Sequence, residues 1–233
     1  TIATAGNATD FGDIATAKGI SIGTCSSSTR GLIGGGQTDP AFYNVIEHIT
    51  IATTGDAVDF GDLSVARNTG AVSNSTRGVF SGGNTNPAGY TSNATIDYVT
   101  IATTGNAVDF GDMNVGKQNY GCVSNGHGGL EIGIDQRTSI TYMPGSGRGF
   151  FLGGYSSPAK KDNIQVIHIP TTGNASDFGN LLAAVYGGAG FGSLTRGFYA
   201  GEVSEANTIE SFEMSSLGNA ADFGDLTVAR QGP

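Results

Sequence analysis

The chain has 233 residues, a formal net charge of −9, 13% charged residues, 39 glycines and no tryptophan. An acidic chain repels phosphate, so we expect no nucleic-acid partner. No apolar run approaches the roughly 20 residues that a membrane-spanning helix needs, so we expect no membrane span. Low charge with abundant Gly, Ser, Thr and Asn predicts a β-rich protein with many tight turns.

One stretch recurs along the whole chain. It reads TIATAGNATDFGD from Thr1, TIATTGDAVDFGD from Thr50 and TIATTGNAVDFGD from Thr100, and weaker copies cover 169–180 and 215–225. The Asp-Phe-Gly signature begins at Asp10, Asp59, Asp109, Asp177 and Asp222, with spacings of 49, 50, 68 and 45 residues. A period in this range predicts a repeat architecture. The first copy starts at Thr1 and not at Met, which favours a processed chain or a part of a longer one.

The clearest unit runs from Thr69 to Lys117. Short strands are predicted at 70–74, 77–83, 94–103 and 107–115, separated by turn signals rich in Asn, Gly and Pro. No stretch keeps apolar residues at helical spacing over three turns. Four short antiparallel strands in about 50 residues, repeated, are typical of a propeller blade, so the predicted fold class is an all-β propeller of about five (four to five) four-stranded blades.

The order of these signatures resembles the kelch repeat. A double Gly closes an apolar strand, an acidic residue precedes an aromatic one in the next strand, and a basic residue follows the outer strand. The resemblance places Phe60, Phe110, Phe178 and Phe223 where kelch units carry Trp, and Arg67, Lys117 and Arg230 at the basic position. The amino-acid sequence of the repeat is also similar to that of tandem repeats in virion proteins of marine tailed phages.

We expect a single propeller domain over 1–233, with repeats at about 1–18, 19–66, 69–116, 118–182 and 185–230. The fourth of these is irregular. Either a hairpin of about 20 residues is inserted within one blade, around 126–146, or one blade has lost its outer strand. The first alternative gives four blades and a leading half; the second gives five, which matches the chain length slightly better.

The repeated Asp-Phe-Gly-Asp has a structural and a functional interpretation. In a strand the Phe would point into the packing between blades, and the Gly would permit a bulge. The alternative is a calcium site built from carboxylates such as Asp59, Asp62, Asp109 and Asp112. Two Asp on opposite strand faces form no cage alone, so the structural role is favoured and no metal or other cofactor is expected.

Four arginines recur after small polar residues, at Arg30, Arg77, Arg148 and Arg196. They could hold anionic sugars, but their presence in every copy favours bidentate pairing with a repeated Asp of the same or the next blade. The Gly clusters at 34–36, 82–83 and 153–154 open no helix, so they are predicted to serve tight packing and unusual φ angles and not phosphate binding. Cys25 and Cys122 are predicted to be free, buried thiols.

Any specialised activity should lie where the copies disagree. Two such segments are the loop 84–93 and the insert 126–146. The candidate ligand contacts in them are Asn84, Asn86, Tyr90, Asn93, His127, Glu131, Asp135 and Arg137.

Three functional hypotheses follow. The favoured one is a non-enzymatic structural or host-attachment module of a phage virion, located on the virion or outside the cell. Its partners would be other virion or surface proteins, a second copy, or glycans. The second is a carbohydrate-binding, lectin-like propeller. The third, an enzyme such as a kelch-type copper oxidase or a glycosidase, is disfavoured. Nothing in the pattern groups Tyr, His and Cys as copper ligands. Paired carboxylates for sugar hydrolysis would have to come from outside the repeated tetrapeptide, where Glu131, Asp135, Glu202 and Glu205 are among the few candidates.

Overall fold

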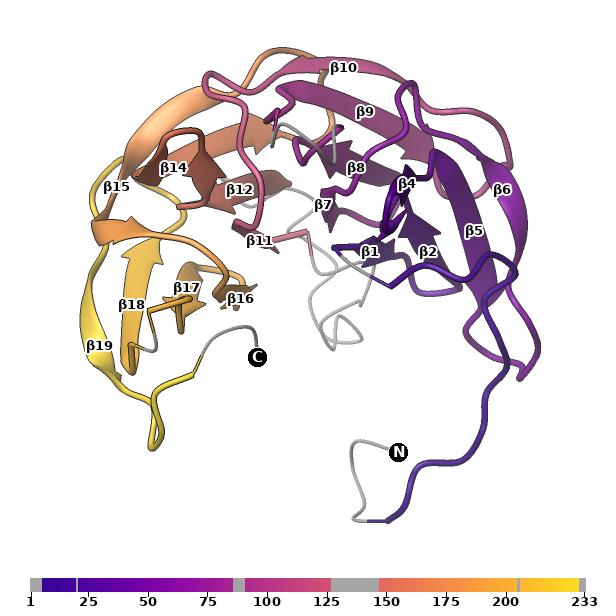
Figure 1. Cartoon of the computed structure of the whole chain (residues 1–233), viewed down its shortest axis with the longest axis horizontal. Helices are drawn as coiled ribbons and strands as arrows, with labels where there is room; N and C mark the ends of the chain where they lie inside the picture. Colours follow the sequence, from indigo (N-terminus) through magenta and orange to yellow (C-terminus); the bar gives the residue numbers. More distant parts are fainter. Residues whose placement is uncertain (1–5, 20, 86–90, 127–146, 205, 231–233) are drawn as a thin grey trace, which may run out of the picture.

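A computed structural model describes residues 6–19, 21–85, 91–126, 147–204 and 206–230. Its secondary structure in these ranges is entirely β. Four small antiparallel sheets are arranged as the blades of a propeller (Figure 1). The blades follow one another along the chain and form an arc that is open between blade 4 and blade 1.

Each blade is an antiparallel meander that runs from an inner to an outer strand. Blade 1 contains β1 (Gly23–Ser26), β2 (Arg30–Gly34), β5 (Val45–Thr50) and β6 (Val58–Asp62), and blade 2 contains β7 (Gly70–Ser73), β8 (Arg77–Ser81), β9 (Thr95–Thr100) and β10 (Val108–Asp112). Blade 3 contains β11 (Gly121–Ser124), β12 (Arg148–Leu152), β14 (Ala159–His168) and β15 (Ser176–Val185), and blade 4 contains β16 (Ala189–Gly192), β17 (Arg196–Ala200), β18 (Thr208–Glu213) and β19 (Ala221–Asp225).

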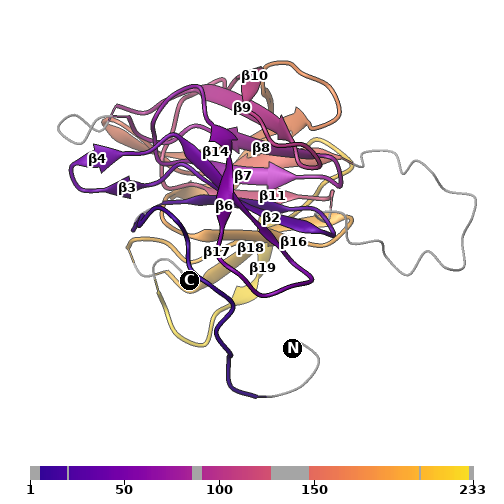
Figure 2. The same cartoon turned by 90° about the vertical axis from the view of Figure 1, so that its right-hand side faces the viewer.

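Two additional hairpins lie between the second and third strands of a blade. In blade 1, β3 (Gln37–Thr38) pairs with β4 (Ala41–Phe42). In blade 3, β13 (Tyr155–Ser156) pairs with the first residues of β14. Figure 2 shows the β3–β4 hairpin projecting at one side of the arc. The copies therefore differ at the connection from strand two to strand three.

The predicted propeller fold is confirmed, and the number of blades is four, the lower of the two predicted counts. Within blade 3, β11 pairs directly with β12, with Cys122 opposite Phe151. The insert 126–146 therefore lies between the first and second strands of one blade, which agrees with the first of the two alternatives. The second strand of blade 3 is β12, and residues 127–146 lie outside the described residues.

The hydrophobic core consists of three clusters, and each one joins two successive blades. The residues shared between blades 1 and 2 are Leu32, Ile46, Phe60, Leu63, Phe80, Val99 and Ile101. Blades 2 and 3 share a cluster around Phe110 and Phe151, and blades 3 and 4 share one around Phe150 and Phe212. Burial of apolar area between blades thus holds the arc together.

The repeated Phe forms a β-bulge in every blade. Phe60 lies where the pairing of β5 with β6 shifts by one residue, and Phe110, Phe178 and Phe223 occupy the same place in β10, β15 and β19. A bulged residue leaves the strand ladder, so its carbonyl is free for another partner. Phe60, Phe110 and Phe178 are buried, which confirms the predicted packing between blades.

The next blade supplies the partner of that carbonyl. The Gly105 amide donates to the Phe60 carbonyl at 2.7 Å, and the Ala107 amide donates to the Asp62 carbonyl at 2.8 Å. The Asp62 amide in turn donates to Asn106 Oδ1 at 3.1 Å. We call this three-bond contact the clip. It recurs with Gly173, Asn174 and Ala175 on β10, and with Gly218, Asn219 and Ala220 on β15.

The clip explains why a single stretch of sequence is repeated so closely. Within TTGNAVDFGD, the segment Gly105–Ala107 binds the preceding blade and the segment Phe110–Asp112 binds the following one. Asp56 replaces the Asn in one copy and accepts from the Asp13 amide at 2.9 Å, because a carboxylate oxygen replaces the amide oxygen as acceptor. The repeated residues therefore form the hydrogen bonds that join one blade to the next.

Glycine is required at the bulge. Gly61 has a φ of 144°, and a Cβ there would lie 2.4 Å from the Gly105 carbonyl oxygen. The predicted Gly clusters also have positive φ, for example 53° at Gly82 and 94° at Gly83. Their predicted role in tight packing and unusual φ is confirmed.

Candidate functional site

The basic residue that follows the outer strand reaches into the next blade. Arg67 lies in the connection from blade 1 to blade 2. Its Nη2 is 2.9 Å from Asp97 Oδ2 of β9, and both side chains are fully buried. Asp97 also accepts from the Ser64 amide at 3.2 Å and from the Ser64 hydroxyl at 2.8 Å. Arg67 Nε has no hydrogen-bond partner among the described residues. The ion pair is therefore part of the joint between blades 1 and 2.

The equivalent positions in the other blades vary this pair. Lys18 Nζ lies 3.7 Å from Glu47 Oε2 and donates to the Val45 carbonyl at 3.0 Å. Burial lowers the pKa of Lys18, and Glu47 opposes that shift. In blade 4 the acidic position is Glu210, where burial raises the carboxyl pKa and the Leu182 amide donates to its Oε2 at 2.8 Å.

Lys117 is buried without an acid at the equivalent position, which is Gln165. Its ammonium donates to the carbonyls of Phe151 and Asn163, at 3.0 and 3.1 Å. Gln165 Oε1 accepts from the Asn114 amide at 2.8 Å. Burial lowers the pKa of Lys117 to about 7. This group therefore titrates near neutral pH, although every one of these contacts joins blade 2 to blade 3.

The recurring arginines also bind the next blade, but their partners differ from the prediction. Arg30 Nη1 donates to the carbonyls of Ile101 and Ala102, at 3.0 and 2.9 Å. Arg77 Nη1 donates to the Ile169 carbonyl at 3.1 Å, and Arg148 Nη1 to the Met214 carbonyl at 2.7 Å. The expected pairing with a repeated Asp is wrong for these three. Free carbonyls at the ends of third strands take that role.

The aspartates considered for calcium lie along the outer strands. Asp59, Asp109 and Asp112 are exposed and Asp62 is half-buried. In the described part of the chain, no three His, Cys, Asp or Glu side chains gather closely enough to hold a metal ion. The Asp62 and Asp112 backbone groups take part in the clip.

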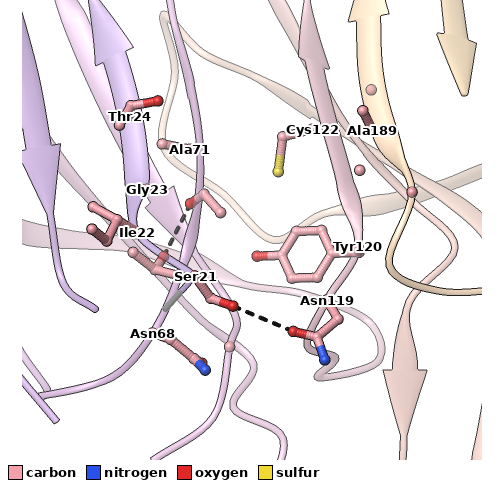
Figure 3. Close-up of a pocket in the computed structure, with 16 residues that line it drawn as sticks. Ser21, Ile22, Gly23, Thr24, Asn68, Ala71, Asn119, Tyr120, Cys122 and Ala189 are labelled. Atoms are coloured by element: carbon pink, nitrogen blue, oxygen red, sulfur yellow. Dashed lines mark hydrogen bonds between the residues drawn. The ribbon is translucent and has the colours of Figure 1, made fainter. Parts of the chain in front are cut away.

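A cavity of about 530 Å³ lies where the inner strands of all four blades converge (Figure 3). We call it the axial cavity. Five of its polar side chains come from the segments that lead into β1, β7 and β11, and Thr24 lies in β1 itself. These side chains are Ser21, Thr24, Asn68, Thr69, Asn119 and Tyr120. The rest of its lining is mainly Gly and Ala, and no charged residue is among the lining residues.

Glycines allow the inner strands to approach one another around the axial cavity. A Cβ at Gly70 would lie 2.5 Å from Cys122 Sγ, and a Cβ at Gly190 would lie 2.6 Å from the Cys122 carbonyl oxygen. A larger residue at either position would push two blades apart. The small residues thus set the width of the cavity.

Two residues that line the axial cavity adopt left-handed backbone conformations. Ser21 has a φ of 48° and Asn119 a φ of 53°, and they are the positive-φ residues other than Gly within the described ranges. The Ser21 hydroxyl donates to Asn119 Oδ1 at 3.4 Å, across the cavity from blade 1 to blade 3 (Figure 3). Strained backbone of this kind clusters at functional sites in proteins generally.

The remaining reactive side chains of the axial cavity are protonated at neutral pH. Burial raises the pKa of the Cys122 thiol to about 12, and it also raises the pKa of the Tyr120 phenol. The Tyr120 hydroxyl donates to the Ser81 carbonyl and lies 2.9 Å from the Ser81 hydroxyl. Cys25 and Cys122 are free, as predicted, and each residue as a whole is half-buried. The cavity therefore offers neutral hydrogen-bonding groups.

The structure places two of the eight predicted contact residues. Asn84 is buried and its amide donates to Asn68 Oδ1, while the Asn93 amide donates to the Gly83 carbonyl at 2.8 Å. Both therefore shape the connection from β8 to β9. The other six, Asn86, Tyr90, His127, Glu131, Asp135 and Arg137, lie outside the described residues.

Sequence reasoning missed the axial cavity. A usable signal was present, because the residue pair before each inner strand differs between copies: Asn68-Thr69 in one repeat and Asn119-Tyr120 in the next. The pair is followed by Gly in both repeats. These residues alone do not reveal the axial cavity, because it forms only where the inner strands of four blades meet in the assembled arc.

No protein-family model and no curated protein matches this chain. Within the described residues, no helix is long and apolar enough to cross a membrane.

Proposed function

We propose that this chain is a non-enzymatic structural and host-attachment module of a phage virion. The observation that supports this most strongly is how the repeated charged residues are used. Arg67, Asp97, Arg30, Arg77 and Arg148 all bind across blade boundaries. The repeat therefore builds a firm scaffold. The similarity of the repeat sequence to tandem repeats of virion proteins supports the assignment to a phage particle.

An antibody against the purified chain tests the virion part of this proposal. The antibody should label intact particles of a tailed phage that encodes the chain, in immunogold electron microscopy. A particle from the same lysate that lacks the gene is the control. Label restricted to host-cell debris, with unlabelled particles, would refute the assignment.

Carbohydrate binding is the second candidate, and the axial cavity supports it. A cavity of this volume suits a small ligand, and hydroxyl, amide and phenol groups without charge suit a neutral sugar. Cations that could select an anionic sugar do not line it. The ligand class that fits best is therefore a neutral saccharide held by Ser21, Asn68, Asn119 and Tyr120.

A glycan array followed by NMR titration tests this second candidate. Neutral glycans should bind, and the variant Asn119→Gly should lose binding because it removes the amide while allowing the positive φ. Asn174→Gly is the control, since Asn174 lies in an outer turn and does not line the axial cavity; it removes one hydrogen bond of a clip but no group of the site. Equal binding by both variants, or array signals for acidic glycans alone, would refute a neutral-sugar site in the axial cavity.

A further inference from the structure

Blade 4 presents the same face to the open side of the arc that blades 1 to 3 bury against their neighbours. The bulged Phe223 is 56% exposed, whereas Phe60, Phe110 and Phe178 at the equivalent position are at most 3% exposed. Its neighbour Phe198 is half-buried, although the equivalent Leu32, Val79 and Phe150 are at most 1% exposed. Phe191, Phe198 and Phe223 form one aromatic cluster, with ring centroids 5.2 and 5.0 Å apart.

The polar groups of this face repeat the acceptor half of a clip. Gly224 has the bulge φ of 146° and open space where a Cβ would lie, whereas a Cβ at the equivalent Gly179 would meet the Gly218 carbonyl oxygen at 2.2 Å. The carbonyls of Phe223 and Asp225 occupy the positions at which Phe60 and Asp62 accept from the next blade.

The cations of this face are also without the partners that their equivalents have. Arg30, Arg77 and Arg148 bind carbonyls of the next blade, but Arg196 Nε pairs with Glu213 of its own blade, at 2.8 Å and with half of each side chain exposed. Arg230 is exposed and donates to the Val228 carbonyl, whereas the equivalent Arg67 is buried against Asp97. The face thus offers two cations to an incoming partner.

We propose that this outer face of blade 4 is a docking surface for one further blade of the same repeat. The partner is defined by chemistry: an antiparallel sheet with a Gly-Asn-Ala turn that donates to Phe223 and Asp225, an apolar second strand that covers Phe198, and an acid in its third strand for Arg230. Three copies of the clip, each with an apolar cluster between the blades, already join blades within the molecule.

A second copy of the chain fits this face less well. The face of blade 1 that would have to dock is already covered by residues 10–18. The Gly55 amide donates to the Phe11 carbonyl at 2.8 Å, and Lys18 lies against Glu47. A second copy would first have to displace this segment. An additional blade docks without any such displacement.

The proposal can be tested by extending the chain with a blade of known sequence. A second Asn68–Lys117 segment is joined in register after Arg230, as it follows Arg67 in the chain. Urea unfolding and amide exchange are measured with and without the extension. The extended chain should unfold at a higher urea concentration, and the Asp225 amide should exchange at least tenfold more slowly, because the new Asn side chain accepts its hydrogen bond.

Gly224→Ala separates docking from a general effect of the extension. Its backbone strain is present in both chains and cancels, but the clash with the new turn exists only when a blade is docked. The variant should therefore shift the urea midpoint much more in the extended chain than in the original one, and by about as much as Gly179→Ala does in either. The latter variant is the matched internal control.

Three outcomes would overturn the proposal. One is an equal effect of Gly224→Ala in the two chains. The second is an appended segment whose amides exchange freely while the first four blades stay protected. The third is concentration-dependent self-association of the original chain that Gly224→Ala abolishes, because the occupant would then be a second copy.

Discussion

Arg67 Nη2 lies 2.9 Å from Asp97 Oδ2, and the two side chains belong to different blades and are fully buried. Removing one member of a buried ion pair leaves the other charge without compensation, which costs about 3–5 kcal/mol. We therefore expect Asp97→Ala to lower the free energy of unfolding by about that amount in urea denaturation. Glu213→Ala breaks the exposed pair with Arg196 and should cost less than about 1 kcal/mol. Equal losses would contradict the assigned roles.

Lys117 makes the stability of the protein depend on pH. Its pKa is about 7 in the folded state and 10.5 when unperturbed, so between these values the unfolded chain binds one proton more. The contribution of Lys117 to the free energy of unfolding therefore rises as the pH rises from about 7 toward 10.5. Below about pH 7 this contribution does not change with pH, because the amine is protonated in both states. Thermal unfolding between pH 7 and about 9 should show this rise, and Lys117→Met should remove it. Above pH 9 the raised pKa of Cys122 acts in the opposite direction, because the unfolded chain loses the thiol proton first.

The variant Gln165→Glu serves as a control for Lys117, because it adds a carboxylate that can pair with the ammonium. A carboxylate at this position recreates the relationship of Arg67 to Asp97 and favours the charged ammonium. The rise of stability with pH should then become smaller. A slope unchanged by either substitution would show that another group is responsible.

The equivalent Phe178 and Phe223 provide a matched pair for core packing. Phe178 is 3% exposed within the cluster between blades 3 and 4, and Phe223 is 56% exposed. Phe178→Ala should cost about 3–5 kcal/mol, the range for a buried Phe. Phe223→Ala should cost under about 1 kcal/mol in urea unfolding, as for most exposed positions. A large loss at Phe223 would mean that its face is already covered in solution.

Gly61 and Gly55 separate steric clash from backbone strain. Both have φ values that disfavour other residues, 144° and 157°. A Cβ at Gly61 would lie 2.4 Å from a carbonyl oxygen of the next blade, whereas a Cβ at Gly55 would meet no atom within 4 Å. Gly61→Ala should therefore lower the unfolding midpoint clearly more than Gly55→Ala. Amide exchange should locate the extra loss at Gly105 and Ala107, whose amides form the clip.

The thiol of Cys122 should react slowly with a thiol reagent. Burial raises its pKa to about 12, so the nucleophilic thiolate is scarce at pH 8. The reaction rate of the folded protein should lie at least tenfold below that of the urea-unfolded chain. Cys25→Ser leaves Cys122 as the single thiol and assigns the signal. Rapid labelling in the folded state would contradict this account.

Local features of the blades could be predicted from the sequence to within a few residues. Strands were expected at 70–74, 77–83, 94–103 and 107–115, and the structure has them at Gly70–Ser73, Arg77–Ser81, Thr95–Thr100 and Val108–Asp112. Turn residues and strand alternation determine such boundaries locally. The bulge at Gly61 and the burial of Phe60 were predicted for the same reason.

Contacts between blades could not be predicted in the same way. The partner of Arg77 is the Ile169 carbonyl, and a carbonyl is present at every residue, so no side-chain pattern identifies it. The axial cavity likewise depends on four inner strands that are far apart in the sequence. Its Ser21–Asn119 contact joins residues 98 positions apart.

Both halves of the clip lie within the same ten letters, as in Thr103–Asp112. A gene segment that is duplicated or deleted in register thus carries a matching donor turn and acceptor bulge together. Unequal recombination between copies would change the number of blades in the arc. Every remaining joint between two blades would still pair a donor turn with an acceptor bulge.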